Sequence, residues 1–174
     1  ITSDTTPTFD VTCTELGSTV TLYVDGVVHG TVSCSLVGVA QVTASPAVGD
    51  GVHGISYTET DALGNTSGQS PSLGVTIDTT APAAPVIVID SVTVDNYINA
   101  SEAASTVAIT GTVTGAQSGE TITLTVNAQT YTATIDVSGN FSVNVPGSGL
   151  VSDADTTIDA SLTTNDTAGN STVG

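Results

Sequence analysis

The sequence predicts an all-β protein built from two tandem β-sandwich domains. Three segments carry an apolar residue at every second position: STVTLYVDG at 18–26, ETITLTVNA at 120–128 and NFSVNVPG at 140–147. Successive strand side chains point to opposite faces, so this alternation indicates half-buried strands. Turn sequences such as Asp25-Gly26 and Ser138-Gly139-Asn140 separate such runs, and no segment has a convincing helical pattern. Short strands at this spacing are typical of a sandwich.

An internal repeat divides the chain into two copies. Segment 17–26 (GSTVTLYVDG) aligns with 119–128 (GETITLTVNA), and segment 59–65 (ETDALGN) aligns with 164–170 (TNDTAGN). A repeated unit of about 100 residues accounts for both alignments. We therefore predict a first domain at 1–80 and a second at 86–174. The linker at 81–85 contains Pro82 and Pro85, which favour extended backbone.

The charge balance limits the classes of partner. The chain has 17 Asp and Glu residues and no Lys or Arg. Nucleic acid is excluded and anionic membrane surfaces are disfavoured, because binding to phosphate relies on cations. The carboxylates can be paired only with backbone N–H groups, two histidines, water or metal ions. Calcium is the expected cofactor because it prefers oxygen ligands; the alternative is that the acids only solvate the surface.

No apolar run approaches the roughly 18 residues that would indicate a membrane span, so no direct membrane insertion is expected. No signal peptide is visible either, and the sequence is interpreted as a mature or excised segment.

Specific motifs recur in order along the chain: SDTTPTF, TLYVDG, TDALGN, DTTAPAAP, VDNYINASEA and NDTAGNST. They resemble the tandem bacterial immunoglobulin-like repeats of giant secreted adhesins, the RTX or LapA-type biofilm adhesins of Gram-negative bacteria. The resemblance covers nearly the whole chain. It implies two seven-strand immunoglobulin-like sandwiches arranged end to end, type I secretion to the bacterial cell surface and stalks stiffened by calcium. It also implies no catalysis, and a surface target carried elsewhere in the parent protein.

The chain departs from the family pattern at both ends. A complete unit should begin with a strand like 85–96 (PVIVIDSVTVDN) and should end with one like 72–80 (SLGVTIDTT). We therefore expect the first domain to lack its first strand and the second to lack its last. Either the sequence is a window from a longer array, or neighbouring chains supply the missing strands by strand addition.

The acids collect in the loops at the domain ends. Loops that meet at a joint can supply calcium with oxygens from residues far apart in sequence. A junction site would combine Asp78 with Asp4 or Asp50, and with Asp166 or Asp136. An end site in the second copy would use Asp95, Asn99, Glu102, Asp153 and Asp155. The candidate ligands are Asp4, Asp50, Asp78, Asp95, Asn99, Glu102, Asp153, Asp155 and Asp166.

Turn chemistry is the alternative for every aspartate, because Asp and Asn bond to their own backbone in loops. We favour this interpretation for Asp25, Asp61 and Asp136. The two cysteines, Cys13 and Cys34, permit one disulfide in a secreted chain, or they are two small buried apolar residues. No catalytic pairing is supported around the two histidines.

The leading hypothesis is a calcium-stiffened structural segment of a cell-surface adhesin, with adjacent immunoglobulin-like domains of the same or neighbouring chains as partners. The alternative is a subunit of an extracellular filament assembled by strand complementation. A third hypothesis, a module that grips a glycan, peptide or ice surface, has no specific support. The chain has no Trp, and few aromatic residues are available for stacking on sugars.

Overall fold

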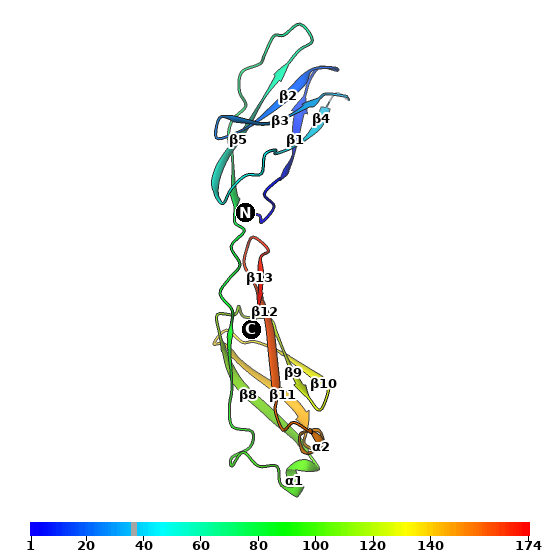
Figure 1. Ribbon diagram of the computed structural model, residues 1–174, viewed down its shortest axis with the longest axis vertical. Helices are drawn as coiled ribbons and strands as arrows, with labels where there is room; N and C mark the ends of the chain where they lie inside the picture. The colour runs from blue at the N-terminus through cyan, green and yellow to red at the C-terminus, as the bar shows by residue number, and fades with distance from the viewer. Residues whose placement is uncertain (36–37) are drawn as a thin grey trace. The chain divides into compact units, whose positions relative to one another are not determined.

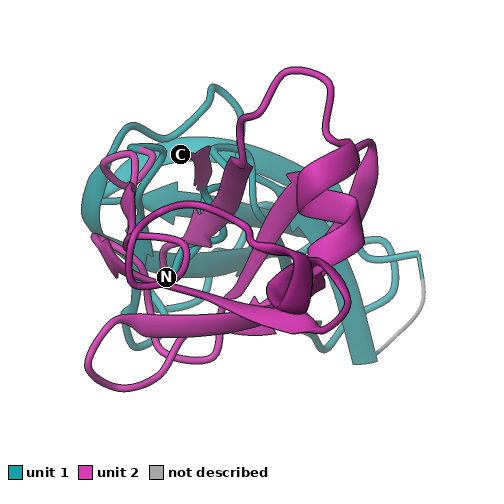
Figure 2. Ribbon diagram, turned by 90° about the horizontal axis from the view of Figure 1, so that it is seen from below, with its two compact units in different colours: residues 1–80, 167–170 teal, residues 81–166, 171–174 magenta. Residues whose placement is uncertain are grey.

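The computed structural model describes residues 1–35 and 38–174. Two compact units are present: unit 1 comprises 1–80 and 167–170, and unit 2 comprises 81–166 and 171–174 (Figure 2). The first unit thus includes the short segment 167–170, which lies far along the chain from the rest of it. Residues 81–85 have no regular secondary structure.

Unit 1 is formed by two antiparallel sheets (Figure 1). The smaller sheet pairs β1 with β4, and the larger has the order β3-β2-β5-β6. The six strands are β1 (Thr8–Cys13), β2 (Thr19–Val24), β3 (Val27–Ser33), β4 (Gly38–Thr43), β5 (Gly51–Thr60) and β6 (Leu73–Ile77).

Unit 2 repeats this arrangement with one further strand. Its sheets have the orders β11-β8-β7 and β10-β9-β12-β13, with two short helices (Figure 1). The elements are β7 (Val86–Ile89), α1 (Ala100–Ala103), β8 (Thr106–Thr114), β9 (Thr121–Val126), β10 (Gln129–Thr134), β11 (Asn140–Pro146), α2 (Gly147–Ser152), β12 (Asp159–Asn165) and β13 (Ser171–Val173).

The strand alternation builds one core in each unit. In β2 the buried residues are Val20, Leu22 and Val24. In β9 they are Ile122, Leu124 and Val126, at the same positions of the repeat. Each sheet therefore turns one apolar face inward and one polar face outward, as the period of two predicts. The all-β prediction is confirmed.

The hairpins that follow these strands have the expected turn geometry. Asp25 and Gly26 both have positive φ (50° and 81°), and so do Asn127 and Ala128 (48° and 57°). Two successive residues with positive φ form the turn whose twist matches a two-residue hairpin. Ala128 is an uncommon choice there, because a Cβ atom disfavours positive φ.

The structure corrects two expectations for unit 2 and adds one short strand. The added strand, Ser171–Val173, pairs with β12 directly after the D-x-x-G-N loop, as Thr66 bridges Thr60 in unit 1. The first strand stops at Ile89 instead of continuing through the following loop. Two helices were also missed, since neither reaches the length at which a helical period can be read.

Unit 1 has no counterpart of β7 among its described residues. In unit 2, β8 lies between β11 and β7, whereas β1 pairs only with β4.

Candidate functional site

Asp4 and Asp78, two predicted ligands in unit 1, each cap a short turn. Asp4 Oδ1 accepts a hydrogen bond from the Thr6 N–H at 2.8 Å, and Asp78 Oδ1 accepts one from the Thr80 N–H at 3.1 Å. The Asp78 N–H donates to the Thr2 carbonyl at 3.0 Å, so the segments that carry the two acids lie side by side. Bonds of this kind, two residues along the chain, are the turn chemistry expected of Asp.

Asp50 reaches the segment that follows β6. Its Oδ1 accepts hydrogen bonds from Thr79 N–H at 3.0 Å and Thr79 Oγ1 at 2.9 Å. Thr80 Oγ1 donates to its other oxygen at 3.4 Å. The Val48 N–H donates to the Thr5 carbonyl at 2.7 Å, which ties the loop before Asp50 to the N-terminal segment. The structure therefore brings the three predicted acids of unit 1 to one end of that unit.

Asn99 and Glu102 begin helix α1 as a capping box. Asn99 Oδ1 accepts from the Ser101 and Glu102 N–H groups at 2.9 and 3.1 Å, and the Asn99 N–H donates to Glu102 Oε2 at 2.9 Å. This reciprocal bonding satisfies N–H groups that the first helical turn leaves free. Both predicted ligands thus have a local structural role, which the N-x-x-E spacing could have revealed.

Asp153 and Asp155 follow helix α2 and lie beside each other. Asp155 Oδ1 accepts from Thr157 N–H and Oγ1, each at 2.9 Å. The bond from the Thr157 N–H is the largest effect lowering the pKa of Asp155, and the Asp153 carboxyl group is also within hydrogen-bonding reach. Asp153 lines a hollow of about 400 Å³ together with apolar residues such as Leu150. Two adjacent carboxylates repel unless a proton or a cation lies between them.

The other two predicted ligands lie in loops. Asp95 Oδ1 accepts from Thr93 Oγ1 at 3.2 Å and from the Tyr97 N–H at 3.1 Å, another local turn. Asp166 is half-buried directly after β12. Across residues 1–35 and 38–174, no group of three or more His, Cys, Asp and Glu side chains is arranged to hold a metal ion.

The donor types nevertheless suit calcium. Carboxylate and amide oxygens, backbone carbonyls and water are its usual ligands, six to eight in number. Because no three acidic side chains of the described residues converge, backbone carbonyls and water would have to supply most of the shell.

Asp61 and Asp136, two of the three aspartates for which turn chemistry was favoured, each begin a loop of the same type. Asp61 Oδ1 accepts from Leu63 and Asn65 N–H groups at 2.9 and 2.8 Å. Asp136 Oδ1 accepts from Ser138 and Asn140 N–H groups, each at 2.8 Å. Both loops have the sequence D-x-x-G-N, which Asp166 also begins. Hydrogen bonds donated by the asparagine are the main cause of the lowered pKa of both carboxyl groups.

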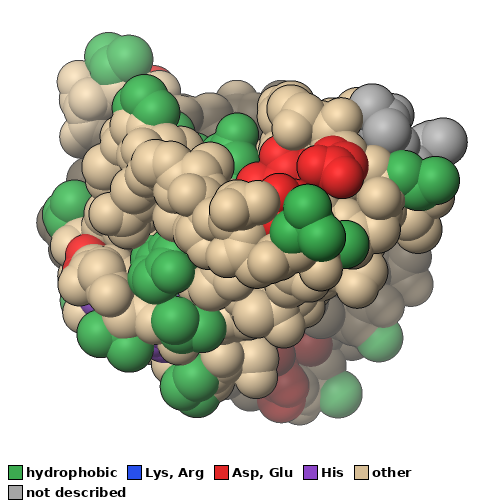
Figure 3. Space-filling view, turned by 90° about the horizontal axis from the view of Figure 1, so that it is seen from above, with side chains coloured by type: hydrophobic (Ala, Val, Ile, Leu, Met, Phe, Trp, Pro, Cys, Tyr) green, Lys and Arg blue, Asp and Glu red, His purple; other side chains and the backbone are tan. Residues whose placement is uncertain are grey.

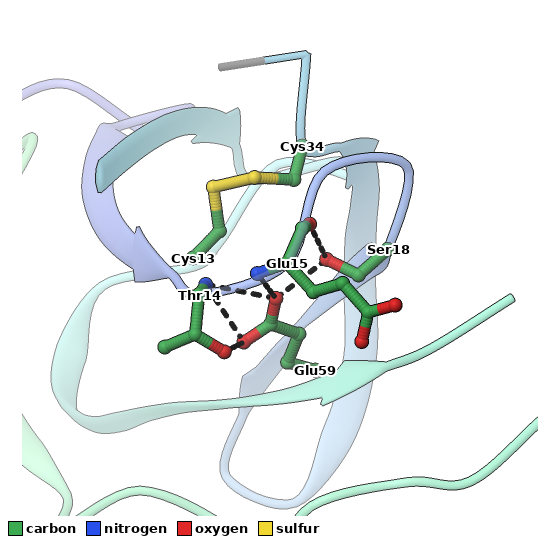
Figure 4. The surroundings of a disulfide bond; sticks show 6 residues. All are labelled: Cys13, Thr14, Glu15, Ser18, Cys34 and Glu59. Atoms are coloured by element: carbon green, nitrogen blue, oxygen red, sulfur yellow. Dashed lines mark hydrogen bonds between the residues drawn. A yellow bond between two sulfur atoms is a disulfide. The ribbon is translucent and has the colours of Figure 1, made fainter. Parts of the chain in front are cut away.

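Glu59 occupies a polar site that the sequence did not reveal (Figure 4). Ser18 Oγ donates to its Oε1 at 2.5 Å, and Thr14 Oγ1 donates to its Oε2 at 2.8 Å. The N–H groups of Thr14 and Glu15 also donate to Oε1, at 2.9 and 3.0 Å. The hydroxyl groups, Ser18 first, lower the pKa of Glu59 from 4.5 to about 2. Figure 4 shows the Glu15 side chain pointing away from this cluster.

The same end of the sandwich carries the disulfide. Cys13 and Cys34 are bonded to each other and fully buried, and Thr14 follows the first of them directly (Figure 4). The disulfide and Glu59 together anchor the turn between β1 and β2.

His53 bridges a hairpin and a loop in unit 1. Its Nδ1 lies 2.8 Å from Asp25 Oδ2 and its Nε2 lies 2.9 Å from the Gly49 carbonyl oxygen. Two acceptors favour the doubly protonated ring, so the pKa of His53 is raised, chiefly by Asp25. Asp25 also accepts from the Gly54 N–H at 2.7 Å, the main cause of its lowered pKa.

The molecular surface reflects the absence of cationic side chains. Figure 3 shows carboxylates in small groups on a face made mostly of uncharged atoms. No Lys or Arg exists anywhere in the chain to pair with them.

Comparison with known proteins identifies the family. A family model for the bacterial Ig-like domain matches residues 1–79. A solved bacterial immunoglobulin-like domain from the M. primoryensis ice-binding adhesin is 45% identical, with a TM-score of 0.50; the match covers 53% of this chain and 90% of that domain. This chain belongs to the bacterial Ig-like domain family.

Two longer solved structures resemble both Ig-like units together. One is a Ca²⁺-stabilised adhesin that helps an Antarctic bacterium reach out and bind ice: 34% identity, 99% of this chain, TM-score 0.73. The other, from work on host cell surface retention of a 1.5-MDa bacterial ice-binding adhesin, gives 34% identity, 98% coverage and a TM-score of 0.70. This Ig-like chain spans 42% of the first structure and 55% of the second.

A search of curated proteins finds no match. The bacterial Ig-like family and these adhesin neighbours are those of a structural protein and not of an enzyme. No helix within the described Ig-like units is long and apolar enough to cross a membrane.

Proposed function

We propose that this chain is a structural segment of a bacterial cell-surface adhesin, stiffened by calcium and located outside the cell. The similarity to a Ca²⁺-stabilised adhesin across 99% of the chain carries the proposal. In this role the segment holds a distant binding module away from the surface, in adhesion or biofilm formation. Its partners are neighbouring Ig-like domains, and the surface target is bound elsewhere in the parent protein.

Uncompensated charge at the unit ends supports calcium as the stiffening ion. Asp153 and Asp155 lie beside each other in unit 2, and Asp50 and Asp78 both bond the Thr79–Thr80 segment of unit 1. Bound calcium would reduce the repulsion between these carboxylates, and any ion that binds only the folded state raises its stability. The junction site that combines residues of both units stays a prediction.

The first experiment measures thermal unfolding and small-angle scattering in millimolar calcium and in EGTA at equal ionic strength. We expect a higher unfolding temperature and a more extended, less flexible particle in calcium. Unchanged curves in EGTA would refute the calcium part of the proposal. A scattering mass well above one chain would instead favour the filament alternative.

A variant pair assigns the effect to a site. Asp153→Asn with Asp155→Asn should reduce the number of calcium ions measured by calorimetry. Asp159→Asn, which removes one charge from an exposed position in β12, should leave that number unchanged. Equal calcium binding by all three proteins would exclude the helical end of unit 2 as a calcium site.

A further inference from the structure

The two histidines of the chain contact one loop of unit 1, the segment 44–50 between β4 and β5. His29 Nδ1 lies 3.1 Å from the Pro46 carbonyl oxygen, and His53 Nε2 lies 2.9 Å from the Gly49 carbonyl oxygen. His29 belongs to β3 and His53 to β5 (Figure 1). Imidazole rings from two strands therefore hold the same loop.

His53 differs from His29 because acceptors face both of its ring nitrogens. Its Nδ1 lies 2.8 Å from Asp25 Oδ2, while its Nε2 faces the Gly49 carbonyl. A carboxylate and a carbonyl oxygen only accept, so both contacts are hydrogen bonds only when the ring carries two protons. In the neutral ring one nitrogen presents a lone pair, and one of the two contacts becomes repulsive. The single contact of His29 is satisfied by a neutral ring.

The contact with Gly49 is the one that a neutral His53 loses. Asp25 is an ionised acceptor, and the Gly54 N–H fixes its other oxygen at 2.7 Å. Hydrogen bonds to an ionised group are roughly twice as strong as those between neutral groups, so the remaining proton stays on Nδ1. The His53 side chain is only 17% exposed, so the ring has little room to turn Nε2 toward water.

The surroundings of His53 favour its charged form. Asp25 is the main cause of the raised pKa of His53, followed by the hydrogen bond to Gly49. β6 pairs with this part of β5 and carries no titratable residue. The titratable groups of the surrounding segments are Asp25 in the β2–β3 turn, His29 in β3, Asp50 in the loop, Tyr57 and Glu59 further along β5, and Asp78 just after β6.

We propose that His53 is a pH-dependent switch, which holds the loop at 44–50 to the β2–β3 turn while the ring is protonated and releases the loop when the proton is lost. The loop carries Val48, a buried core residue whose N–H donates to the Thr5 carbonyl at 2.7 Å. It also carries Asp50, which bonds to Thr79 after β6. Release of the loop therefore loosens this end of unit 1. The inference concerns unit 1 alone and depends neither on the adhesin role nor on calcium.

The direction of the pH effect follows from the change in proton affinity on folding. The pKa of His53 is raised above 6.5 in the folded state. Its stabilisation is therefore fully present below pH 6.5 and is lost as the pH rises through the folded value. The pKa of Asp25 is lowered, so its stabilisation is lost in acid instead. Loosening on the alkaline side thus separates His53 from the carboxylates.

The test follows the intact wild-type chain by NMR in EGTA, from about pH 5 to about pH 9. The His53 ring should titrate with a midpoint above 6.5, and the Val48 and Gly49 amide shifts should follow the same midpoint. Protection of the Val48 amide, corrected for the intrinsic exchange rate, should fall several-fold above that midpoint. A midpoint at or below 6.5, or loop amides that do not follow the ring, would overturn the proposal.

Variants assign the effect to His53. His53→Gln is neutral at every pH and should abolish the pH dependence of Val48 protection. His29→Gln is the matched control, because it removes the other histidine that contacts the loop and should leave that dependence in place. A dependence that survives His53→Gln, or that disappears in His29→Gln, would overturn the assignment.

Asp25→Asn keeps the test decisive if His53→Gln does not fold. Asn tolerates the positive φ of this position, and the exchange removes the charge beside the ring. The His53 midpoint should therefore fall relative to wild type. An unchanged midpoint would show that Asp25 does not hold the ring in its charged form and would also overturn the proposal.

Discussion

At the scale of single residues, a glutamate in each unit links two segments by hydrogen bonds. One segment is the turn before β2 or β9, and the other is the neighbouring strand, β5 or β12. In unit 1, Glu59 reaches from β5 to the turn that contains Ser18, which is buried. In unit 2, Glu120 lies in the corresponding turn and accepts from Thr164 Oγ1 and the Asn165 N–H, each at 3.0 Å. The glutamate therefore lies in the strand in unit 1 and in the turn in unit 2, and the hydroxyl donor lies on the other segment in each case. With no Lys or Arg in the chain, hydroxyl and N–H groups stabilise these carboxylates.

Replacing Glu59 with Gln should lower the free energy of unfolding by about 1–3 kcal/mol at pH 7, because bonds to an ionised acceptor are lost and one buried hydroxyl is left poorly satisfied. The pKa of Glu59 is lowered in the folded state to about 2, from 4.5. Its stabilisation is therefore present above pH 4.5 and is lost as the pH falls toward 2.

Urea unfolding at several pH values between neutral and about 2 checks this. The difference between wild type and Glu59→Gln should shrink on acidification. Glu15→Gln removes the same charge from a side chain that points away from the cluster, so it should have little effect (Figure 4). A difference that stays constant with pH would show that the carboxylate is not the stabilising group.

The disulfide is a second effect at residue scale. Cys13 and Cys34 are 21 residues apart, so replacing both with Ala should lower stability by roughly 3 kcal/mol through the entropy of the unfolded chain. Reduced wild-type protein is the control, and it should unfold at nearly the same urea concentration as the double variant. If neither differs from the oxidised wild type, the bond contributes no stability.

At the scale of elements, complementary side-chain volumes set how β7, β8 and β11 meet. Phe141 in β11 lies opposite Gly111 in β8. A Cβ atom at Gly111 would lie 2.6 Å from Phe141 Cζ and still closer to the Val88 carbonyl oxygen. At the matching positions of unit 1, the pair is Ala40 and Val11, so the larger side chain has changed strands. Close packing requires such exchanges, since cores have little free volume.

Gly111→Ala should therefore destabilise unit 2 by about 1–3 kcal/mol, the usual cost of overpacking. Gly74→Ala in β6 is the control, because its Cβ would meet nothing within 4 Å. Thermal unfolding of both variants is the measurement, and only Gly111→Ala should lower the unfolding temperature. A Gly111→Ala protein as stable as Gly74→Ala would mean that both the Val88 backbone and the Phe141 ring can move aside.

At the scale of the whole molecule, the formal net charge of −17 acts without any opposing Lys or Arg. Repulsion among so many like charges opposes the compact state. Cations relieve it in two ways: diffuse screening by any salt, and specific binding where oxygens converge. The two can be separated experimentally, because only screening depends on ionic strength alone.

Raising sodium chloride from about 10 mM to about 150 mM should raise the unfolding temperature, since the screening length falls from about 30 to 8 Å. Calcium at matched ionic strength should give a further rise, and magnesium a smaller one, because magnesium retains its water and demands stricter geometry. Equal effects of sodium and calcium would mean screening alone. A fall with sodium chloride would mean that repulsion is not what limits stability.

The sequence by itself determined the all-β class and the alternating strands such as β2, β9 and β11, because alternation and turn residues are local signals. It also determined that the carboxylates had no Lys or Arg partners. Only the tertiary structure decided which oxygens meet. The capping box of Asn99, the N–H cluster around Glu59 and the adjacency of Asp153 and Asp155 depend on how loops fold over strand ends. Likewise, the place of β8 between β11 and β7 appears only when strand order is known, because pairing joins residues that are distant in sequence.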